Sequence, residues 1–255
     1  MINYIKRYLG GDIMNKKVFY SLVALLMVLT LSINVSANQL NSGINEYQNG
    51  NYEDALDYFN KYLENNDSSY EIQYYLGLTY LKLDEYKSAA DSLNKAYTLN
   101  NDNYKVMVNL GRVNYHLKNY QKAEKILNNA KSKANIDDQV YNLLGLIQMD
   151  QKNYSKAVDN FTKALEYDQK NYYIYNNLGY SYLLQGKYKK AKNSLEKAVE
   201  LDPVVPYIYN NLGIAYENLG EIEKAYNSYK NAIEIDSNYE KAKNNLKRIE
   251  EKTSL

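Results

Sequence analysis

Apolar residues recur at helical spacing in two neighbouring stretches of residues 175–203, and a short glycine-containing break at 185–187 separates them. The apolar positions are Leu178, Tyr182 and Leu183 in the first stretch and Ala191, Leu195, Ala198 and Val199 in the second. Pro203 ends the pattern, because the residue before a proline is disfavoured in a helix. The pattern predicts two short amphipathic helices that together are too small to bury both of their apolar faces.

The same arrangement recurs through the chain at one constant spacing. Six glycines share this spacing, although the chain has only 11, and we call them the lattice glycines: Gly43, Gly77, Gly111, Gly145, Gly179 and Gly213. Six alanines follow the same spacing: Ala55, Ala89, Ala123, Ala157, Ala191 and Ala225. A second alanine series begins one repeat later, because Tyr62 takes its first position: Ala96, Ala130, Ala164, Ala198 and Ala232. We interpret these series as packing positions.

Glycine inside a helix costs roughly 1 kcal/mol relative to alanine, so six of them require a packing purpose. We expect the glycine of each first helix and the alanine of each second helix to let the two backbones approach closely. The second alanine series is expected to face the first helix of the following repeat. Each repeat then contacts mainly its neighbours, and a continuous core exists only in the stack.

These positions resemble the tetratricopeptide repeat family, whose 34-residue pattern is Trp-x2-Leu-Gly-x2-Tyr, then Ala-x3-Phe, then Pro. Leu178-Gly179 and Tyr182 match the first part, and Ala157 and Phe161 match the second. The chain departs from the pattern in having no tryptophan and in placing a proline at the closing turn only once, at Pro203. The resemblance implies an all-α fold, an α-solenoid in which six antiparallel helix pairs form a right-handed superhelix.

The repeats divide the chain into three predicted parts. Residues 1–37 precede the repeats, residues 38–237 hold the six repeats, and residues 238–255 form a C-terminal capping helix and tail. The shortened first helix of the first repeat is expected over residues 38–49. The cap has an apolar face and is otherwise largely charged, as the end of a solenoid requires.

Residues 14–37 have the three parts of a secretory signal. A short cationic head at Met14–Lys17 precedes an apolar run from Val18 to Ile33, and small residues follow at 35–37. We predict that translation starts at Met14, that cleavage follows Ala37, and that the repeats are exported to the cell surface or secreted. The alternative is an uncleaved N-terminal helix that anchors the repeats outside the membrane.

Composition argues against several classes of function. The formal net charge is +1, and without residues 1–37 the chain holds 27 basic and 29 acidic residues, so we expect no nucleic-acid partner. Cysteine is absent, which removes disulfides, thiolate nucleophiles and cysteine-ligated zinc. The one histidine, His116, has no acidic or hydroxyl partner at helical spacing. We therefore expect no catalytic residue, metal or cofactor, and no enzymatic activity.

In the family that the chain resembles, residues at three positions of each first helix line the concave face and meet a ligand. The resemblance therefore implies an apolar and aromatic groove with asparagines toward its later end. The implied groove residues are Tyr74, Leu78, Arg112, Tyr115, Asn142, Leu146, Asn176, Tyr180, Tyr207 and Asn210. The three asparagines either bond the backbone of a bound peptide or are polar residues of the helix surface.

Three functions remain open at the level of the sequence. The favoured one is an exported protein-interaction scaffold that binds a peptide or helix of a partner in the groove. The second is a cell-wall or exopolysaccharide-associated binding protein in which Tyr173, Tyr180 and Tyr207 stack on sugars. The third is a helper domain of an enzyme assembly whose catalytic subunit is encoded elsewhere.

Overall fold

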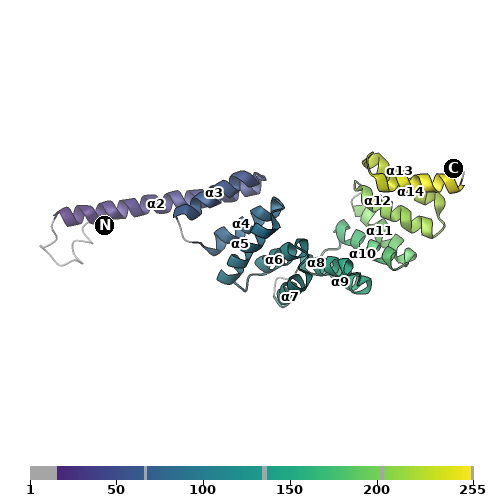
Figure 1. The fold of residues 1–255 in the computed structure, drawn as a ribbon, viewed down its shortest axis with the longest axis horizontal. Coiled ribbons are helices and arrows are strands. Elements are labelled where there is room, and N and C mark those ends of the chain that lie inside the picture. Colours follow the sequence, from purple (N-terminus) through teal and green to yellow (C-terminus); the bar gives the residue numbers. More distant parts are fainter. Residues whose placement is uncertain (1–15, 66–67, 134–136, 202–203, 254–255) are drawn as a thin grey trace. The chain divides into compact units, whose positions relative to one another are not determined.

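The computed structural model describes residues 16–65, 68–133, 137–201 and 204–253, and these residues form thirteen α-helices and no strand (Figure 1). In chain order they are α2 (Lys16–Asn49), α3 (Tyr52–Asn65), α4 (Tyr70–Lys82), α5 (Tyr86–Leu99), α6 (Tyr104–His116), α7 (Tyr120–Ala130), α8 (Asp138–Asp150), α9 (Tyr154–Tyr167), α10 (Tyr172–Leu184), α11 (Tyr188–Leu201), α12 (Pro206–Asn218), α13 (Ile222–Ile235) and α14 (Glu240–Thr253).

Consecutive helices pack as six pairs, from α2 with α3 to α12 with α13, and α14 packs on α13. The chain divides into two compact units: residues 1–100 hold α2–α5, and residues 101–255 hold α6–α14. Within each unit every pair also contacts the next along the chain, as α9 contacts α10 and α11 contacts α12. The predicted all-α solenoid of helix pairs is confirmed.

Each lattice glycine lies against a large side chain of the second helix of its own pair. A Cβ added to Gly145 would come within 2.5 Å of Phe161 Cε1, and one added to Gly179 within 2.6 Å of Leu195 Cγ. The partner stands at the same offset from its glycine in every repeat: Phe59, Leu93, Leu127, Phe161, Leu195 and Tyr229. The predicted close approach is therefore present. The glycine makes room for this large residue, and at Gly179 the added Cβ would also lie 3.3 Å from the backbone oxygen of Ala191.

The two alanine series lie in the core and have no exposed surface in any repeat. Ala157 and Phe161 pack together with Ala164 of the same helix, and this cluster also includes Ile174 and Leu178 from α10, the first helix of the next repeat. The later alanine series thus faces the following repeat in this part of the stack, as the sequence predicts. The small side chain allows the next pair to come close.

The break between the two helices of a pair has the same backbone form in all six repeats. Its central residue has a positive φ, at Gly50, Asp84, Lys118, Lys152, Gly186 and Gly220. The amide of the following residue donates to a carbonyl five residues earlier, as Asn153 N does to Gln148 O at 2.8 Å and Lys187 N does to Tyr182 O at 2.9 Å. This bond gives a partner to a carbonyl at the helix end, where the regular helical hydrogen bonds run out.

The first helix of the first repeat is part of α2. In the full chain α2 begins at Lys16 and continues through residues 38–49, the segment predicted to be the shortened first helix of the chain cleaved after Ala37. In α2, Leu40, Ile44 and Tyr47 lie against the core of α3 and α4. Earlier in α2, Tyr20 and Met27 are more than 60% exposed. The predicted start at Met14 lies outside the described residues.

Within the described residues, no helix combines the length and the apolar character that crossing a bilayer requires.

Replacement of Gly145 by alanine should lower the free energy of unfolding by about 1 kcal/mol, because the clash with Phe161 outweighs the better helix propensity of alanine. Urea unfolding followed by circular dichroism measures the change. Ser155→Ala, at an exposed position of α9, is the control and should change little. A rise in stability of about 1 kcal/mol for Gly145→Ala would show that propensity alone governs the position.

Replacement of Lys152 by glycine should raise the free energy of unfolding by about 0.5–1 kcal/mol, because it removes the strain of an L-residue at φ +63°. The reciprocal change, Gly186→Ala, should lower it by a similar amount. A Cβ at Gly186 meets nothing within 4 Å, so that cost is purely conformational. Thermal and urea unfolding of both variants measure the two stability changes. If the free energy of unfolding changed in the same direction in both, strain at the positive φ would not be the cause.

Candidate protein-binding surface

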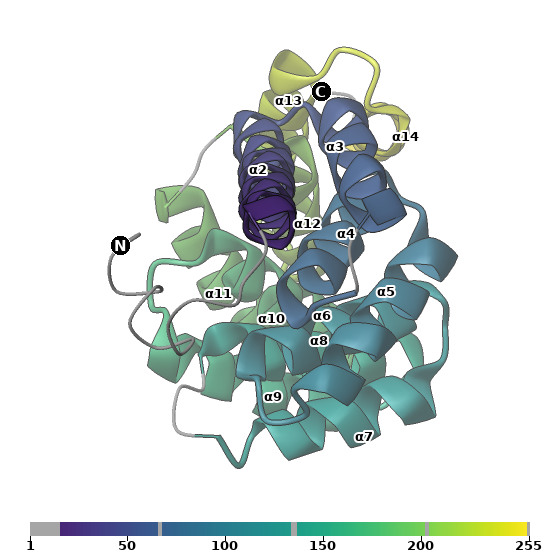
Figure 2. The same ribbon diagram turned by 90° about the vertical axis from the view of Figure 1, so that its left-hand side faces the viewer.

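The candidate surface in unit 2 is formed by the first helices of successive pairs. Helix α6 contacts α8, α8 contacts α10, and α10 contacts α12, in addition to the contacts of each helix with its own partner. Figure 2 views these helices from the end, with α6, α8 and α10 next to one another and α7 and α9 below them. The first helices thus form one layer of unit 2, and residues at equivalent positions of successive repeats lie in lines across it.

The predicted groove residues fall on this layer or on its equivalent in unit 1. In unit 1, Tyr74 and Leu78 are half-buried on α4, and the ring of Tyr74 stacks on that of Tyr70 with 6.0 Å between centroids. In unit 2 the half-buried residues are Arg112 and Tyr115 on α6, Asn142 and Leu146 on α8, and Tyr207 on α12. Tyr180 on α10 is exposed, whereas Asn176 and Asn210 are buried.

The asparagines form regular hydrogen bonds between repeats. The Oδ1 atoms of the three predicted asparagines each accept from the side-chain amide of an asparagine in the next repeat: Asn142 from Asn177 at 3.5 Å, Asn176 from Asn211 at 3.0 Å, and Asn210 from Asn245 at 2.9 Å. We call these pairs the asparagine ladder. It joins α8, α10, α12 and α14, so these side chains hold successive first helices together. Their role in binding a peptide backbone stays a prediction.

The ladder shows how α14 fits the repeat. Asn245 stands one full repeat after Asn211, so α14 occupies the place of a seventh first helix. The equivalent of the lattice glycine is Lys247, whose side chain is 76% exposed. A second helix packed as in the other repeats would have to lie against this residue. The long charged side chain therefore suits the end of a stack.

A polar network closes the ladder at α14. Arg248 donates to both oxygens of Glu217 on α12, at 2.5 and 3.2 Å, and to Asn245 Oδ1 at 2.8 Å. The buried Tyr229 on α13 donates its hydroxyl to Glu217 Oε2 at 2.9 Å. Burial, followed by this bond, raises the pKa of Tyr229, so its hydroxyl stays protonated and serves as a donor. The paired guanidinium compensates the partly buried carboxylate.

At the other end of unit 2, polar contacts join α6 to α8. Arg112 donates to Gln139 Oε1 at 2.6 Å, and the Tyr104 hydroxyl donates to Asp137 Oδ1 at 2.5 Å. Asp137 in turn caps the N-terminus of α8 by accepting from Gln139 N at 3.0 Å. Burial and the neighbouring Asp150 raise the pKa of Tyr115 to about 12, so this hydroxyl also stays neutral.

Between these ends, α10 presents exposed aromatic and apolar side chains. Tyr173 is 52% exposed, Tyr180 37% and Leu184 40%. The rings of Tyr172 and Tyr173 lie 4.2 Å apart between centroids. The described chain therefore leaves aromatic surface in contact with water at the middle of the layer.

In the described part of the chain, no group of three His, Cys, Asp or Glu side chains is placed to hold a metal ion.

The spacing of the asparagines in the sequence already indicates the ladder, although no single asparagine does. Asn142, Asn176 and Asn210 share the spacing of the lattice glycines, and so do Asn177, Asn211 and Asn245. Two neighbouring series of the same polar residue suggest a pairing across repeats. Which asparagine pairs with which depends on the offset between adjacent first helices, and this offset is a property of the stack.

Five tetratricopeptide repeat models match the chain, and together they cover residues 40–245. The matched segments are residues 179–220 (TPR repeat) and residues 40–104, 80–147, 139–171, 206–245 and 160–193 (tetratricopeptide repeat). The chain belongs to the tetratricopeptide repeat (TPR) family. A search of curated proteins returned no match.

Solved structures of similar fold share little sequence with this TPR chain. A chain of the APC/C hetero-tetramer Cut9–Hcn1 is 19% identical, with a TM-score of 0.73 over 84% of the present chain. The present chain spans only 42% of that one. PilF of Pseudomonas aeruginosa is 18% identical, with a TM-score of 0.72 over 83% of this chain and 96% of PilF. YrrB, described as a TPR protein with an unusual peptide-binding site, is 19% identical, with a TM-score of 0.57 over 73% of this chain and 96% of YrrB. These likenesses show the fold.

Replacement of Asn176 by alanine should lower the free energy of unfolding by about 1–2 kcal/mol, because the Asn211 amide loses its acceptor. Urea unfolding measures the change. The control is Asn160→Ala, whose half-buried side chain bonds only the backbone of its own helix among the described contacts. If both variants unfold at the same urea concentration as the unmodified chain, the ladder contributes nothing to the stack.

Proposed function

We propose that this TPR protein is an exported protein-interaction scaffold whose first-helix surface binds a peptide or helix of a partner protein. The TPR fold is a scaffold for protein–protein interaction, and YrrB is a family member described as having a peptide-binding site. The observation that carries the proposal is the exposed aromatic surface of α10, at Tyr173 and Tyr180. Exposed aromatic side chains are enriched where proteins bind one another.

The polar residues of the same layer support a protein partner. Asn142 uses its Oδ1 atom in the asparagine ladder, and its half-buried side chain has N–H donors beside that acceptor, whereas Asn176 and Asn210 are buried. The carbonyl groups of an extended peptide are acceptors of the kind that these donors require. Tyr and Leu side chains beside them offer apolar contacts for alternate peptide side chains.

Export is part of the proposal and rests on residues 14–37. The cationic head, the apolar run and the small residues at 35–37 are those of a secretory signal. The packing of α2 is compatible with cleavage after Ala37, because Leu40, Ile44 and Tyr47, which contact α3 and α4, all lie beyond that point. Removal of the exposed apolar residues before it leaves these contacts of the first repeat in place.

The alternative is binding to a cell-wall polysaccharide or an exported polysaccharide. The exposed rings of Tyr173 and Tyr180 are the observation that favours it, because sugars stack on aromatic faces. We also propose that the chain catalyses no reaction and holds no cofactor.

The test compares Tyr173→Ala/Tyr180→Ala with the unmodified protein by crosslinking on intact cells, purification and mass spectrometry of the captured proteins. Tyr167→Ala is the matched control, because Tyr167 is 48% exposed but lies on the second helix α9. We expect one defined exported protein to be lost at least tenfold with the double variant and retained with the control. Circular dichroism should show unchanged helix content for both variants.

The two candidate functions give different outcomes in this experiment. Loss of binding to isolated cell walls or purified polysaccharide, with no protein lost, would favour the polysaccharide function. Equal capture by all three proteins would exclude the α10 surface as the binding site. The mass of the protein recovered from the cell surface or medium reports cleavage after Ala37 independently, and recovery only from the cytoplasm would contradict export.

A further inference from the structure

The two parts of the repeat array carry opposite charge. Residues 38–100 contain four lysines, no arginine and ten acidic residues, a net charge of −6. Residues 101–255 contain 23 basic and 19 acidic residues, a net charge of +4. The near-neutral total therefore hides a separation of charge along the array. Opposite charge on two parts of one molecule favours contact between the acidic part of one copy and the basic part of another.

The negative charge of unit 1 is concentrated on α3. The exposed side chains Glu53, Asp54, Asp57 and Glu64 form what we call the acidic face of α3. No carboxylate among the described residues of unit 1 forms an ion pair with a lysine or arginine, whereas ion pairs are frequent in unit 2. Tyr58 follows Asp57 in α3 and is 36% exposed, and Lys61 Nζ lies 5.9 Å from the centre of its ring. The acidic face thus combines four carboxylates outside ion pairs with an aromatic side chain.

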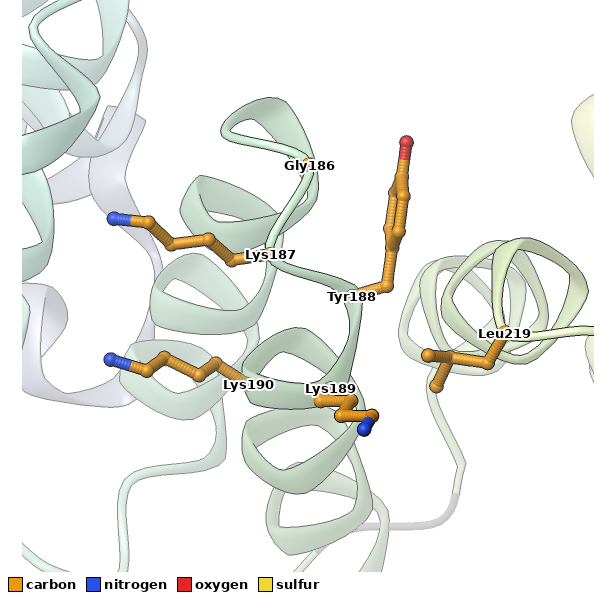
Figure 3. Close-up of a pocket in the computed structure, with 6 residues that line it drawn as sticks. All are labelled: Gly186, Lys187, Tyr188, Lys189, Lys190 and Leu219. Carbon is orange, nitrogen blue, oxygen red and sulfur yellow. The ribbon is translucent and has the colours of Figure 1, made fainter.

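Unit 2 contains a pocket that is complementary to this face. Gly186, Lys187, Tyr188, Lys189, Lys190 and Leu219 line an open pocket of about 430 Å³ at the turn between α10 and α11 (Figure 3). We call it the lysine pocket. Tyr188, whose ring points upward in this view, and Leu219 lie on its two sides, Lys189 lies at its edge, and Lys187 and Lys190 extend to the other side of the turn. A pocket within the range of small-molecule sites, ~300–1,000 Å³, has room for one aromatic ring.

The lysines of this pocket stand where positive charge is unfavourable for their own helix. They lie in or next to the first turn of α11, where the helix dipole is positive and acidic residues are favoured. The first turn of α3, in contrast, holds Glu53 and Asp54. In the described structure Lys187 bonds Gln185 Oε1 at 2.5 Å and Lys190 lies 5.7 Å from the ring centre of Tyr182, and neither forms an ion pair with a carboxylate. An acidic surface from outside would satisfy this charge.

We propose that the protein associates with a second copy of itself, the acidic face of α3 in one molecule docking on the lysine pocket of the next. Tyr58 enters the space between Tyr188 and Leu219, and the carboxylates of α3 meet Lys189 at the edge of the pocket. Lys187 and Lys190 reach the same carboxylates by turning their long exposed side chains from the other side of the turn. The contact joins two different surfaces, so it is heterologous and can extend from copy to copy. It leaves the exposed tyrosines of α10 outside the contact, and it does not depend on the proposed partner site.

The experiment measures the molar mass of the full-length chain, purified in a mild non-ionic detergent, by light scattering over a range of concentrations. At about 0.05 M salt we expect the mass to rise with concentration, and at about 0.5 M salt the association should weaken at least tenfold because the charges are screened. A chain that stays monomeric up to about 0.1 mM at low salt, far weaker than the micromolar range of ordinary complexes, would overturn the proposal.

Charge-swap variants identify the surfaces. Variant one carries Lys187→Glu, Lys189→Glu and Lys190→Glu, and variant two carries Glu53→Lys, Asp54→Lys and Asp57→Lys. Each variant alone should lose self-association at least tenfold. An equimolar mixture of the two should associate, because the acidic α3 of variant one then meets the unchanged lysine pocket of variant two. A chain that carries both sets should also associate, because the charges are reversed on both sides of the contact.

The control variant carries Lys118→Glu, Lys122→Glu and Lys125→Glu, which makes the same change of charge near the turn between α6 and α7. It should associate like the unmodified chain. Equal loss in this control would show that only the total charge matters, and failure of the combined variant to associate would show that these surfaces do not meet; either result overturns the proposal. Circular dichroism confirms that each variant is folded before its mass is interpreted.

Discussion

The fold depends on one contact that recurs in every repeat, between a glycine of the first helix and a large side chain at a fixed place in the second. The added Cβ would lie 2.5–2.6 Å from an atom of that side chain in all six repeats. The partner is Phe, Leu or Tyr, and the geometry stays the same. The glycine therefore sets how closely the two helices of a pair approach. The large side chain opposite the glycine can be Phe, Leu or Tyr without changing the distance between the two helices. This distance determines where the next pair can be placed.

Two further features convert a pair of helices into a stack. The positive φ at each turn reverses the chain within a few residues, and three of the six positions tolerate Asp or Lys at some cost in strain. The asparagine ladder then links the first helices of unit 2, and the network of Glu217, Tyr229 and Arg248 fastens α14 to the last pair. Because these bonds cross from repeat to repeat, they restrict the sliding of one helix pair on the next.

The residues that are exposed to solvent differ from those that pack the repeats together. Contacts within the stack involve the lattice glycines, the alanines and the ladder oxygens. Tyr173 and Tyr180, in contrast, are exposed to solvent. The charged residues of α3 and of the α10–α11 turn lie outside the core as well. Packing and binding therefore draw on different positions of the same repeat unit, and the two can vary separately along the chain.

The sequence alone determined the architecture, because a constant period in Gly and Ala has one physical explanation, the close packing of identical helix pairs. It located the turns and the buried alanines, and the family likeness indicated the first-helix surface. It did not show that the glycines face Phe161 and its equivalents, that α2 begins at Lys16, or that Asn176 and Asn210 are buried. These features follow from the offset and rotation of neighbouring helices, and those depend on how all side chains at an interface fit together. Residue spacing specifies which residues share a face; only the packed stack specifies what that face touches.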